Sequence, residues 1–258
     1  MDKQINIQET LDWYIVAGVD EVVGDTPGLA AEKTLPVTPL NKISVKQVNV
    51  STVSTSAALK NAKEACQKAN SLDELRELMI HFDGCNLKNT AASTVFGDGN
   101  PKTKVMLIGE APGADEDRIG KPFVGRCGHL LDKMLAAIGL SRNECYITNV
   151  LPWRPPGNRT PTDEEIAVCL PFLKRQIELI GPDILLLLGG IALKSVLDCN
   201  DSISRTRGKW LQYSLSQNKE LQVLATYHPS YLLRSSNQKA KVWTDFLRLK
   251  KKLGEINQ

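Results

Sequence analysis

The spacing of apolar residues along the chain alternates between two patterns, and together they predict strands separated by helices. Nearly continuous apolar runs, typical of strands buried on both faces, cover residues 104–108, 145–151, 184–188 and 221–226. Helical spacing predicts helices over residues 57–69, 128–139, 162–180, 191–197 and 238–253. Capping boxes mark two helix starts: Ser71 with Glu74, which opens a further helix, and Thr162 with Glu165.

Strands that alternate with helices favour an α/β fold. We expect one α/β domain over residues 58–258, a three-layer α/β/α fold with a central four-stranded parallel sheet. In such folds ligands bind beyond the carboxyl ends of the strands. The loops that begin at Gly109, Pro152, Gly189 and Tyr227 are therefore the places to look for chemistry.

Residues 1–57 differ from the rest, and we expect an N-terminal helical extension there. Apolar spacing predicts a short amphipathic helix over residues 8–23, followed by a flexible linker rich in Pro, Ser, Thr and Val over residues 24–57. Whether the helix packs on the domain or docks another protein stays open. The start lacks a basic and apolar leader, and no apolar run reaches about 18 residues, so we expect no signal peptide and no transmembrane helix.

Charge and cysteine content narrow the class of protein only slightly. Residues 1–58 hold seven acidic and four basic residues, so the remainder carries a net charge of +6. A basic body suits a polyanionic partner, although many basic proteins bind no nucleic acid. The six cysteines include no C-x-x-C pair, which favours reduced, packed thiols over a disulfide framework.

The first two loops carry residues able to face a reacting centre. Glu110 directly follows a strand, and Phe123 could present a ring face to a flat ligand. Asn149 lies near the end of the next predicted strand, where its amide offers both a donor and an acceptor. Each residue alone also has an ordinary explanation, as a solvated acid, a packed ring or a turn residue.

The third and fourth loops add candidates for contacts with an anion. Gly189 and Gly190 precede a helix, whose free amides would suit a phosphate, although a tight turn explains them equally well. His228 follows the last predicted strand, where its imidazole could donate to a developing negative charge. The run of two leucines that ends at Arg234 would place apolar wedges beside a cation, unless both leucines pack in the core.

Taken in order, these loops closely resemble those of the uracil-DNA glycosylase superfamily, and within it the family-four enzymes. The resemblance covers residues 82–252. The segments that carry it are Gly109–Gly113, Gly120–Gly125, Thr148-Asn149, Arg154-Pro155-Pro156 with Asn158-Arg159, Arg207-Gly208-Lys209-Trp210, and His228–Arg234.

The resemblance implies a DNA repair hydrolase, which flips uracil out of DNA and hydrolyses its N-glycosidic bond to leave an abasic site, the first step of base excision repair. It implies that His228 hydrogen-bonds uracil O2 as negative charge builds on the leaving base. It makes Glu110 the second catalytic residue, which orients water, deprotonates water or stabilises the positive sugar; these three roles stay open.

The resemblance also implies residues that bind the base and the DNA. Phe123 stacks on the ring, Asn149 pairs with the amide edge, the backbone amide of Ala111 helps to hold the base, and Glu116 forms a wall against the thymine methyl group. The DNA-binding candidates are Gly189, Gly190, Arg207, Ser230 and Arg234, for phosphate contacts, and the wedge Leu233.

One departure from the family concerns its iron–sulfur cluster, which family-four enzymes typically hold on four cysteines. Only Cys85 and Cys169 match those positions, and Phe82 and Trp153 stand at the other two. A conventional cluster needs four protein ligands. We therefore expect no metal and no cofactor, with Phe82 and Trp153 filling that volume by apolar packing.

Two other interpretations of the function stay open. A catalytically silent DNA-binding module could share the fold, although such a module would not need Glu110, Asn149 and His228 together. A glycosylase could also accept further deaminated bases, such as hypoxanthine or xanthine, and Ala111 beside Glu110 does not settle that range. We expect uracil-containing DNA as the partner, no membrane association, and a cytoplasmic monomer.

Overall fold

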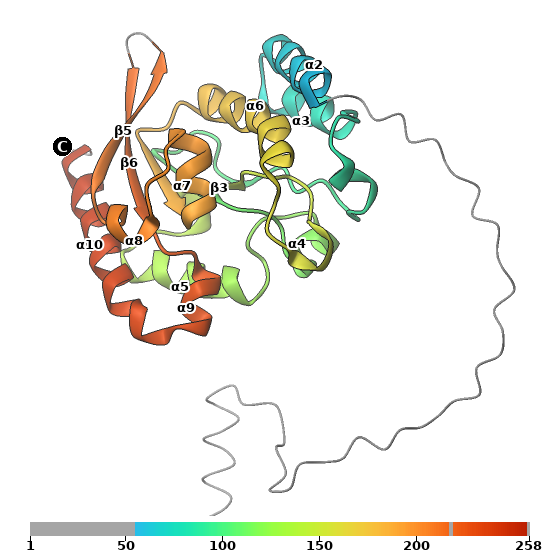
Figure 1. The fold of residues 1–258 in the computed structure, drawn as a ribbon. Helices are drawn as coiled ribbons and strands as arrows, with labels where there is room; N and C mark the ends of the chain where they lie inside the picture. The colour runs from blue at the N-terminus through green and yellow to red at the C-terminus, as the bar shows by residue number, and fades with distance from the viewer. Residues whose placement is uncertain (1–54, 217–218, 257–258) are drawn as a thin grey trace, which may run out of the picture. The chain divides into compact units, whose positions relative to one another are not determined.

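The computed structural model describes residues 55–216 and 219–256, which are built around a six-stranded sheet (Figure 1). The strands lie in the order β1-β3-β2-β4-β6-β5. The inner four are parallel: β3 (Tyr146–Asn149), β2 (Val105–Gly109), β4 (Ile184–Leu188) and β6 (Lys219–Thr226). The edge strands, β1 (Asp98–Gly99) and β5 (Trp210–Ser216), run antiparallel to their neighbours.

The prediction of a four-stranded parallel sheet was incomplete, because it accounts only for the inner strands. Strand β1 has two residues, too few to show a pattern of apolar and polar positions. Strand β5 alternates: Leu211, Tyr213 and Leu215 pack against the core, whereas Gln212 and Ser214 are exposed. Continuous apolar runs identify strands covered on both faces, and an edge strand covered on one face shows this alternation instead.

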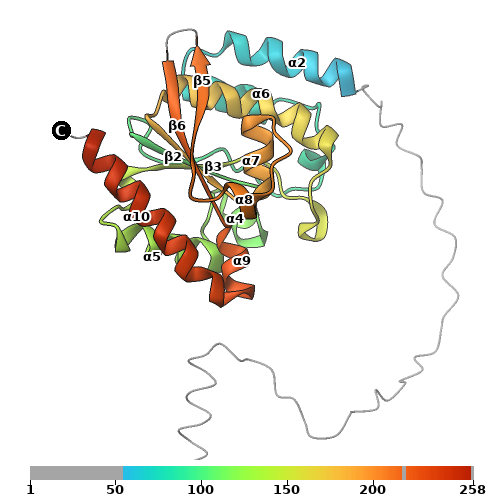
Figure 2. The same ribbon diagram turned by 60° about the vertical axis from the view of Figure 1, so that its left-hand side comes forward.

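Helices cover both faces of the sheet (Figure 2). One face is covered by α2 (Thr55–Lys68), α3 (Leu72–Ile80), α6 (Asp163–Ile180) and α7 (Gly190–Leu197). The other face is covered by α5 (Arg126–Ala137), α9 (Pro229–Arg234) and α10 (Lys239–Ile256). The connecting segments contain α4 (Ala114–Ile119), α8 (Ile203–Thr206) and 3-10 helices at Asn86–Asn89, Arg142–Glu144, Pro156–Asn158 and Ser236–Gln238.

The strands and helices predicted within the described residues are confirmed, with ends that differ by no more than three residues. The capping box of α6 is present, since Thr162 Oγ1 accepts the Glu165 N–H at 3.2 Å and the Glu165 carboxylate accepts the Thr162 N–H at 2.9 Å. At α3, Ser71 Oγ accepts the Glu74 N–H, whereas the Glu74 carboxylate accepts the N–H of Asn70 rather than that of Ser71.

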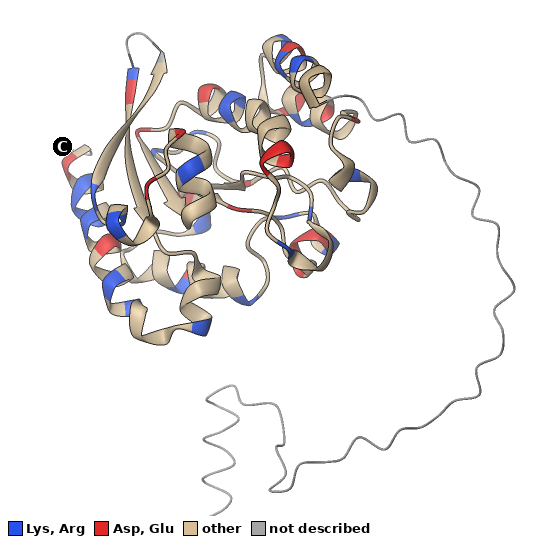
Figure 3. Cartoon of the chain, viewed as in Figure 1, with Lys and Arg blue, Asp and Glu red and all other residues tan. Residues whose placement is uncertain are grey.

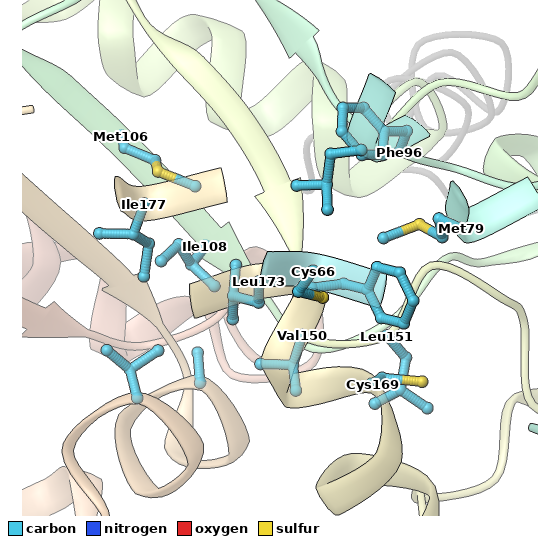
Figure 4. Close-up of a cluster of buried hydrophobic side chains, with 14 of the residues drawn as sticks. Cys66, Met79, Phe96, Met106, Ile108, Val150, Leu151, Cys169, Leu173 and Ile177 are labelled. Atoms are coloured by element: carbon cyan, nitrogen blue, oxygen red, sulfur yellow. The ribbon is translucent and has the colours of Figure 1, made fainter. Parts of the chain in front are cut away.

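Residues of the inner strands alternate between two apolar clusters, one on each face of the sheet. In β4, Leu185 and Leu187 belong to the cluster under α6, whereas Leu186 belongs to the cluster under α5 and α10. Figure 4 shows part of the first cluster, which includes Met106 and Ile108 of β2. Strand β4 is therefore buried on both faces, which explains its unbroken apolar sequence.

Some predictions concern the N-terminal extension. The predicted helix over residues 8–23, and residues 24–54 of the predicted linker, lie outside the described residues. Helix α2 begins at Thr55, so residues 55–57 are helical rather than part of a linker. Within residues 55–216 and 219–256, no helix combines the length and the apolar character that a membrane span requires.

A buried ion pair joins α10 to the sheet. The Asp245 carboxylate is 1% exposed and accepts hydrogen bonds from Thr226 Oγ1 (2.6 Å), Arg207 Nε (3.1 Å) and Arg207 Nη2 (2.6 Å). Burial raises the pKa of Asp245, and the donors of Thr226 and Arg207 oppose that rise. Gly208 permits this close packing, since its φ is +74° and a Cβ atom would lie 2.4 Å from Asp245 Oδ1.

We predict that Asp245→Ala lowers the free energy of unfolding by about 3–5 kcal/mol, because it leaves the Arg207 guanidinium without its buried partner. Urea-induced unfolding measures this loss. Glu255→Ala is the matched control on the same helix, because its ion pair with Lys252 is exposed and should contribute less than about 1 kcal/mol. Equal losses in the two variants would contradict a special role for the buried pair.

Candidate active site

The carboxyl ends of the inner strands open onto a cavity of about 440 Å³, a volume typical of ligand pockets. The loops after β2, β3 and β6 contribute its walls. The residues that line it are Glu110, Ala111, Pro112, Gly113, Ala114, Asp115, Glu116, Phe123, Gly125, Arg126, Cys127, Asn149, Pro155, Asn158, Arg159, His228, Ser230 and Arg234.

The pairing of β2 with β3 brings two of these residues together. Gly109, the last residue of β2, is paired with Asn149, the last residue of β3. A Cβ atom at Gly109 would lie 2.4 Å from Asn149 Oδ1 and 2.5 Å from the Phe123 ring. The side chains of Asn149 and Phe123 therefore both contact the backbone at Gly109, and only glycine at this position leaves room for them.

The side chain of Asn149 carries an unsatisfied acceptor. The residue is 6% exposed, and its Oδ1 is one of two buried side-chain oxygens that lack a hydrogen-bond partner within the described residues. An unpaired buried carbonyl oxygen is costly in a folded protein. Since Asn149 lines the cavity, this oxygen indicates a ligand that donates an N–H or O–H group.

Phe123 presents an aromatic ring beside His228. The ring centroids are 5.4 Å apart and the planes are inclined by 34°. Phe123 has a φ of +53°, in the left-handed region that bulky residues rarely adopt. Its carbonyl lies so close to α5 that a Cβ atom at Gly128 would be 1.8 Å from Phe123 O. The ring is therefore held at the cavity by a strained backbone.

His228 directly precedes α9, and its tautomer follows from a backbone contact. The N–H of Ser230 donates to His228 Nδ1 at 3.1 Å, so Nδ1 accepts and the proton of the neutral ring lies on Nε2. Burial, together with the charge of Arg234, lowers the pKa of His228 to about 4, and Glu116 opposes this shift. At neutral pH the ring is uncharged and offers one N–H donor beside the cavity.

Glu116 connects two loops of the site through its carboxylate. Oε1 accepts the N–H groups of Val124 and Gly125, both at 2.9 Å, and Oε2 accepts the N–H of Gly113 at 3.1 Å. The residue is 8% exposed. Three backbone donors therefore hold this carboxylate in a fixed position at the cavity wall.

Glu110 follows β2 and is partly buried at the cavity. Its carbonyl oxygen accepts the N–H of Leu151 at 3.0 Å, which fixes its backbone against the segment after β3. Burial raises the pKa of the Glu110 carboxyl. The cavity thus combines an acid of raised pKa with a neutral imidazole, and side chains with shifted pKa values gather at functional sites.

The structure brings most of the predicted site residues to this cavity. Those that line it are Glu110, Ala111, Glu116, Phe123, Asn149, His228, Ser230 and Arg234. Gly190 is the first residue of α7 and Gly189 is its N-cap; Gly189 lies next to His228, since a Cβ atom at Gly189 would lie 3.1 Å from His228 Cβ. Arg207 pairs with Asp245 outside the lining, and Leu233 is 42% exposed on α9.

Several residues that line the cavity received no role from the sequence. Arg126 is exposed at the start of α5. Its position directly after the glycine-rich segment is the signal in the sequence that could have identified it. Arg159 also lines the cavity and forms an ion pair with Glu165 at 2.6 Å. Helix α4, beside the cavity, is acidic. Helix α10, in contrast, carries Lys and Arg residues along its length (Figure 3).

Aromatic rings occupy the two positions, Phe82 and Trp153, at which the resemblance to family-four enzymes implied cluster cysteines. The ring of Phe82 packs against Phe172 of α6 with centroids 5.1 Å apart, and Trp153 is 1% exposed in the same apolar cluster. Cys85 and Cys169 are buried, and the interaction between their thiols lowers the pKa of Cys85 and raises that of Cys169. This donor set, two thiols and two rings, does not fit a cluster that needs four cysteine ligands.

Known proteins resemble the chain over this region. A sequence profile described as the Uracil DNA glycosylase superfamily matches residues 96–247, which include every residue that lines the cavity. A type-4 uracil-DNA glycosylase of Archaeoglobus fulgidus is 41% identical over 191 residues, covering 72% of this chain and 93% of that protein. One of Thermotoga maritima is 44% identical over 158 residues, covering 61% and 80%. A type-5 enzyme of Pyrobaculum aerophilum is 31% identical over 149 residues, covering 52% and 64%.

Proposed function

Since the chain belongs to the uracil-DNA glycosylase superfamily, we propose that it removes uracil from DNA by hydrolysing the bond between base and deoxyribose, which leaves an abasic site. The observation that carries this proposal is the buried Oδ1 of Asn149, which lacks a partner within the described residues and lies at a cavity shared with Phe123 and His228. A base stacked in a duplex cannot enter such a cavity, so the target nucleotide has to be flipped out.

Uracil presents the donor that Asn149 lacks. The N3–H group of uracil donates to Asn149 Oδ1, and Asn149 Nδ2 donates to uracil O4. Cytosine has an acceptor at N3 and an amino group in place of O4, so both ends of the amide, in the orientation that the structure shows, would be left unpaired. Because unpaired buried polar groups are costly, this mismatch disfavours cytosine.

The other walls of the pocket position the base. Phe123 stacks on the uracil ring, and the backbone N–H of Ala111 helps to hold it. Glu116 forms the wall that the C5 methyl group of thymine would meet. Its carboxylate can move aside only by losing three hydrogen bonds to backbone N–H groups, which supports a role in the exclusion of thymine.

Cleavage of the N-glycosidic bond produces a negative and a positive charge. One catalytic side chain acts at the base and the other at the sugar or the attacking water. The electron pair of the N-glycosidic bond leaves with the base, so an anion develops on uracil and a cation on the sugar. His228 Nε2–H donates to uracil O2. The Glu110 carboxylate orients water, deprotonates water or stabilises the sugar cation, and each role requires its anionic form. Water supplies the hydroxyl group that ends on the sugar, and the remaining proton of that water ends on the departing uracil.

The DNA backbone is proposed to bind at the rim of the cavity. Ser230, Arg234 and the start of α7 at Gly189 and Gly190 are the candidates for phosphate contacts, which position DNA without reading its sequence. Leu233 is exposed beside Arg234, which supports its role as the wedge that replaces the flipped base. Arg207 was expected at a phosphate, and its buried pairing with Asp245 supports a structural role instead.

We further propose that the protein acts without an iron–sulfur cluster. The support is the donor set, since Phe82 and Trp153 offer no ligand at two of the four positions and pack as core residues. Every step proposed above uses groups of this chain and water alone. That the protein acts as a cytoplasmic monomer stays a prediction.

Excision itself is the first measurement. The protein is incubated with single- and double-stranded oligonucleotides that contain one uracil, and alkali then breaks the strand at abasic sites. We expect breaks at uracil and none where cytosine or thymine replaces it. Binding of the DNA without any breaks, at an excess of protein, would favour a catalytically silent DNA-binding module.

In the same assay under single-turnover conditions, His228→Ala should lower the rate roughly 100- to 1,000-fold, because the leaving base loses its hydrogen-bond donor. His129→Ala is the matched control, since His129 is exposed and outside the cavity lining, and it should keep the wild-type rate. An unchanged rate in His228→Ala would remove His228 from its proposed role.

The pH dependence of the single-turnover rate distinguishes Glu110 from His228. Burial raises the pKa of Glu110 above its ordinary 4.5, so as pH falls its anion is lost while His228, with a pKa of about 4, is still neutral. We expect the rate to fall below a midpoint above pH 4.5, and this acid limb to be absent from Glu110→Gln. A limb that persists unchanged in Glu110→Gln would refute the assignment.

Metal analysis checks the proposal of a cluster-free protein. After anaerobic purification, which prevents oxidative loss of a cluster, we expect neither iron nor acid-labile sulfide in amounts comparable to the protein. Removal of iron by a chelator should likewise leave the rate of excision unchanged. Iron and sulfide near one cluster per chain, with the colour of such a cluster, would show this proposal to be wrong.

A further inference from the structure

The backbone conformation of Phe123 is one that phenylalanine does not favour by itself. Its φ of +53° lies in the left-handed region, where a bulky L-residue is disfavoured. The residue is nevertheless 4% exposed, with its ring beside His228. Such a conformation persists only where the surrounding structure enforces it.

Arg142 donates one hydrogen bond to this strained residue and one to the residue before it. Its Nη1 donates to the carbonyl of Pro122 at 3.1 Å, and its Nη2 donates to the carbonyl of Phe123. These carbonyls belong to the two peptide planes that flank the Cα atom of Phe123. A planar guanidinium that binds both carbonyls fixes the two planes relative to each other, and with them the φ and ψ angles of Phe123.

The Arg142 side chain is itself held from two other elements. Its Nε donates to Asp132 Oδ1 of α5 at 2.7 Å, and its Nη1 contacts Asp98 Oδ2 of β1 at 3.4 Å. The side chain is 22% exposed. Arg142 opens the 3-10 helix that precedes β3, the strand that ends at Asn149. One side chain therefore connects the strand that carries Asn149 to the turn that carries Phe123.

We infer that Arg142 is a positioning residue for base recognition, which holds the left-handed turn at Phe123 so that the ring stacks on the base that Asn149 reads. The inference rests on the proposed function for the role of the ring. It adds a residue that is outside the cavity lining and contacts the base only through Phe123. Gly128 encloses the same turn from α5, where any Cβ atom would meet Phe123 O.

If Arg142 only stabilised the fold, its replacement should affect excision no more than the replacement of another arginine that joins two segments. Arg175 is such an arginine. Arg175 donates to the carbonyl of Ala69 through Nε at 3.1 Å and Nη2 at 2.7 Å, and to Glu178 at 2.7 Å. Its side chain is 26% exposed, close to the value for Arg142. None of these residues lines the cavity.

The experiment compares excision kinetics and inhibition by free uracil in Arg142→Ala, Arg142→Lys and Arg175→Ala. Arg142→Ala should lower kcat/KM roughly 10- to 100-fold, the scale of losing one base-stacking contact. The loss should lie mainly in KM, with weaker inhibition by uracil. Arg142→Lys keeps the charge without the planar fork, so it should show the same kind of loss. Arg175→Ala should keep wild-type values.

A double-variant cycle with Phe123→Ala separates positioning from general stabilisation. If Arg142 acts through the ring, Arg142→Ala combined with Phe123→Ala should be no slower than Phe123→Ala alone. Two independent effects would instead multiply. Circular dichroism establishes that each variant is folded, and if Arg142→Ala is not, Arg142→Lys takes its place in the cycle.

Wild-type kinetics in the Arg142 variants, or losses that multiply in the double variant, would overturn the inference. Equal losses in Arg142→Ala and Arg175→Ala would also overturn it, since they would indicate stability alone. A wild-type protein that excises no uracil would overturn the proposed function, which is a separate result from the same assay.

Discussion

The absence of a side chain at Gly109 is the constraint on which the site depends. The parallel pairing of β2 with β3 places this residue opposite Asn149, and a single methyl group there would overlap both Asn149 Oδ1 and the Phe123 ring. The next residue is Glu110, whose backbone is bonded to the segment after β3. The amide, the ring and the acid thus meet at one point, at which two strands end.

Acidic side chains that bind backbone N–H groups make the surrounding loops rigid. Glu116 accepts three such donors, and its neighbour Asp117 accepts the N–H groups of Ala92 and Ser93 at 2.8 and 3.1 Å. Two successive residues of α4 therefore fasten loops that are far apart in the sequence. Polar groups held in this way are oriented before a substrate arrives, which is the main source of electrostatic stabilisation in enzymes.

What the sequence predicts well depends on local spacing, and what it misses depends on distant partners. Short patterns predict the apolar run of β4 and the positions of Asn149 and His228 at the ends of strands. Strand β5 was missed because its apolar and polar residues alternate instead of forming a continuous apolar run. Arg142 shows no local signal, because its partners lie 10 to 44 residues away in the sequence. An arginine such as Arg207 cannot be assigned to a phosphate or to an internal carboxylate until the fold brings its partner close.

The packing of Phe82 and Trp153 bears on how the cell obtains this protein. A core that contains aromatic side chains at these positions needs only the polypeptide chain to fold. A metal cluster, in contrast, has to be assembled and inserted before its domain is complete. On the cluster-free proposal, the amount of active protein would follow its synthesis alone. The activity that this protein contributes to the removal of uracil from DNA would then not depend on the supply of iron.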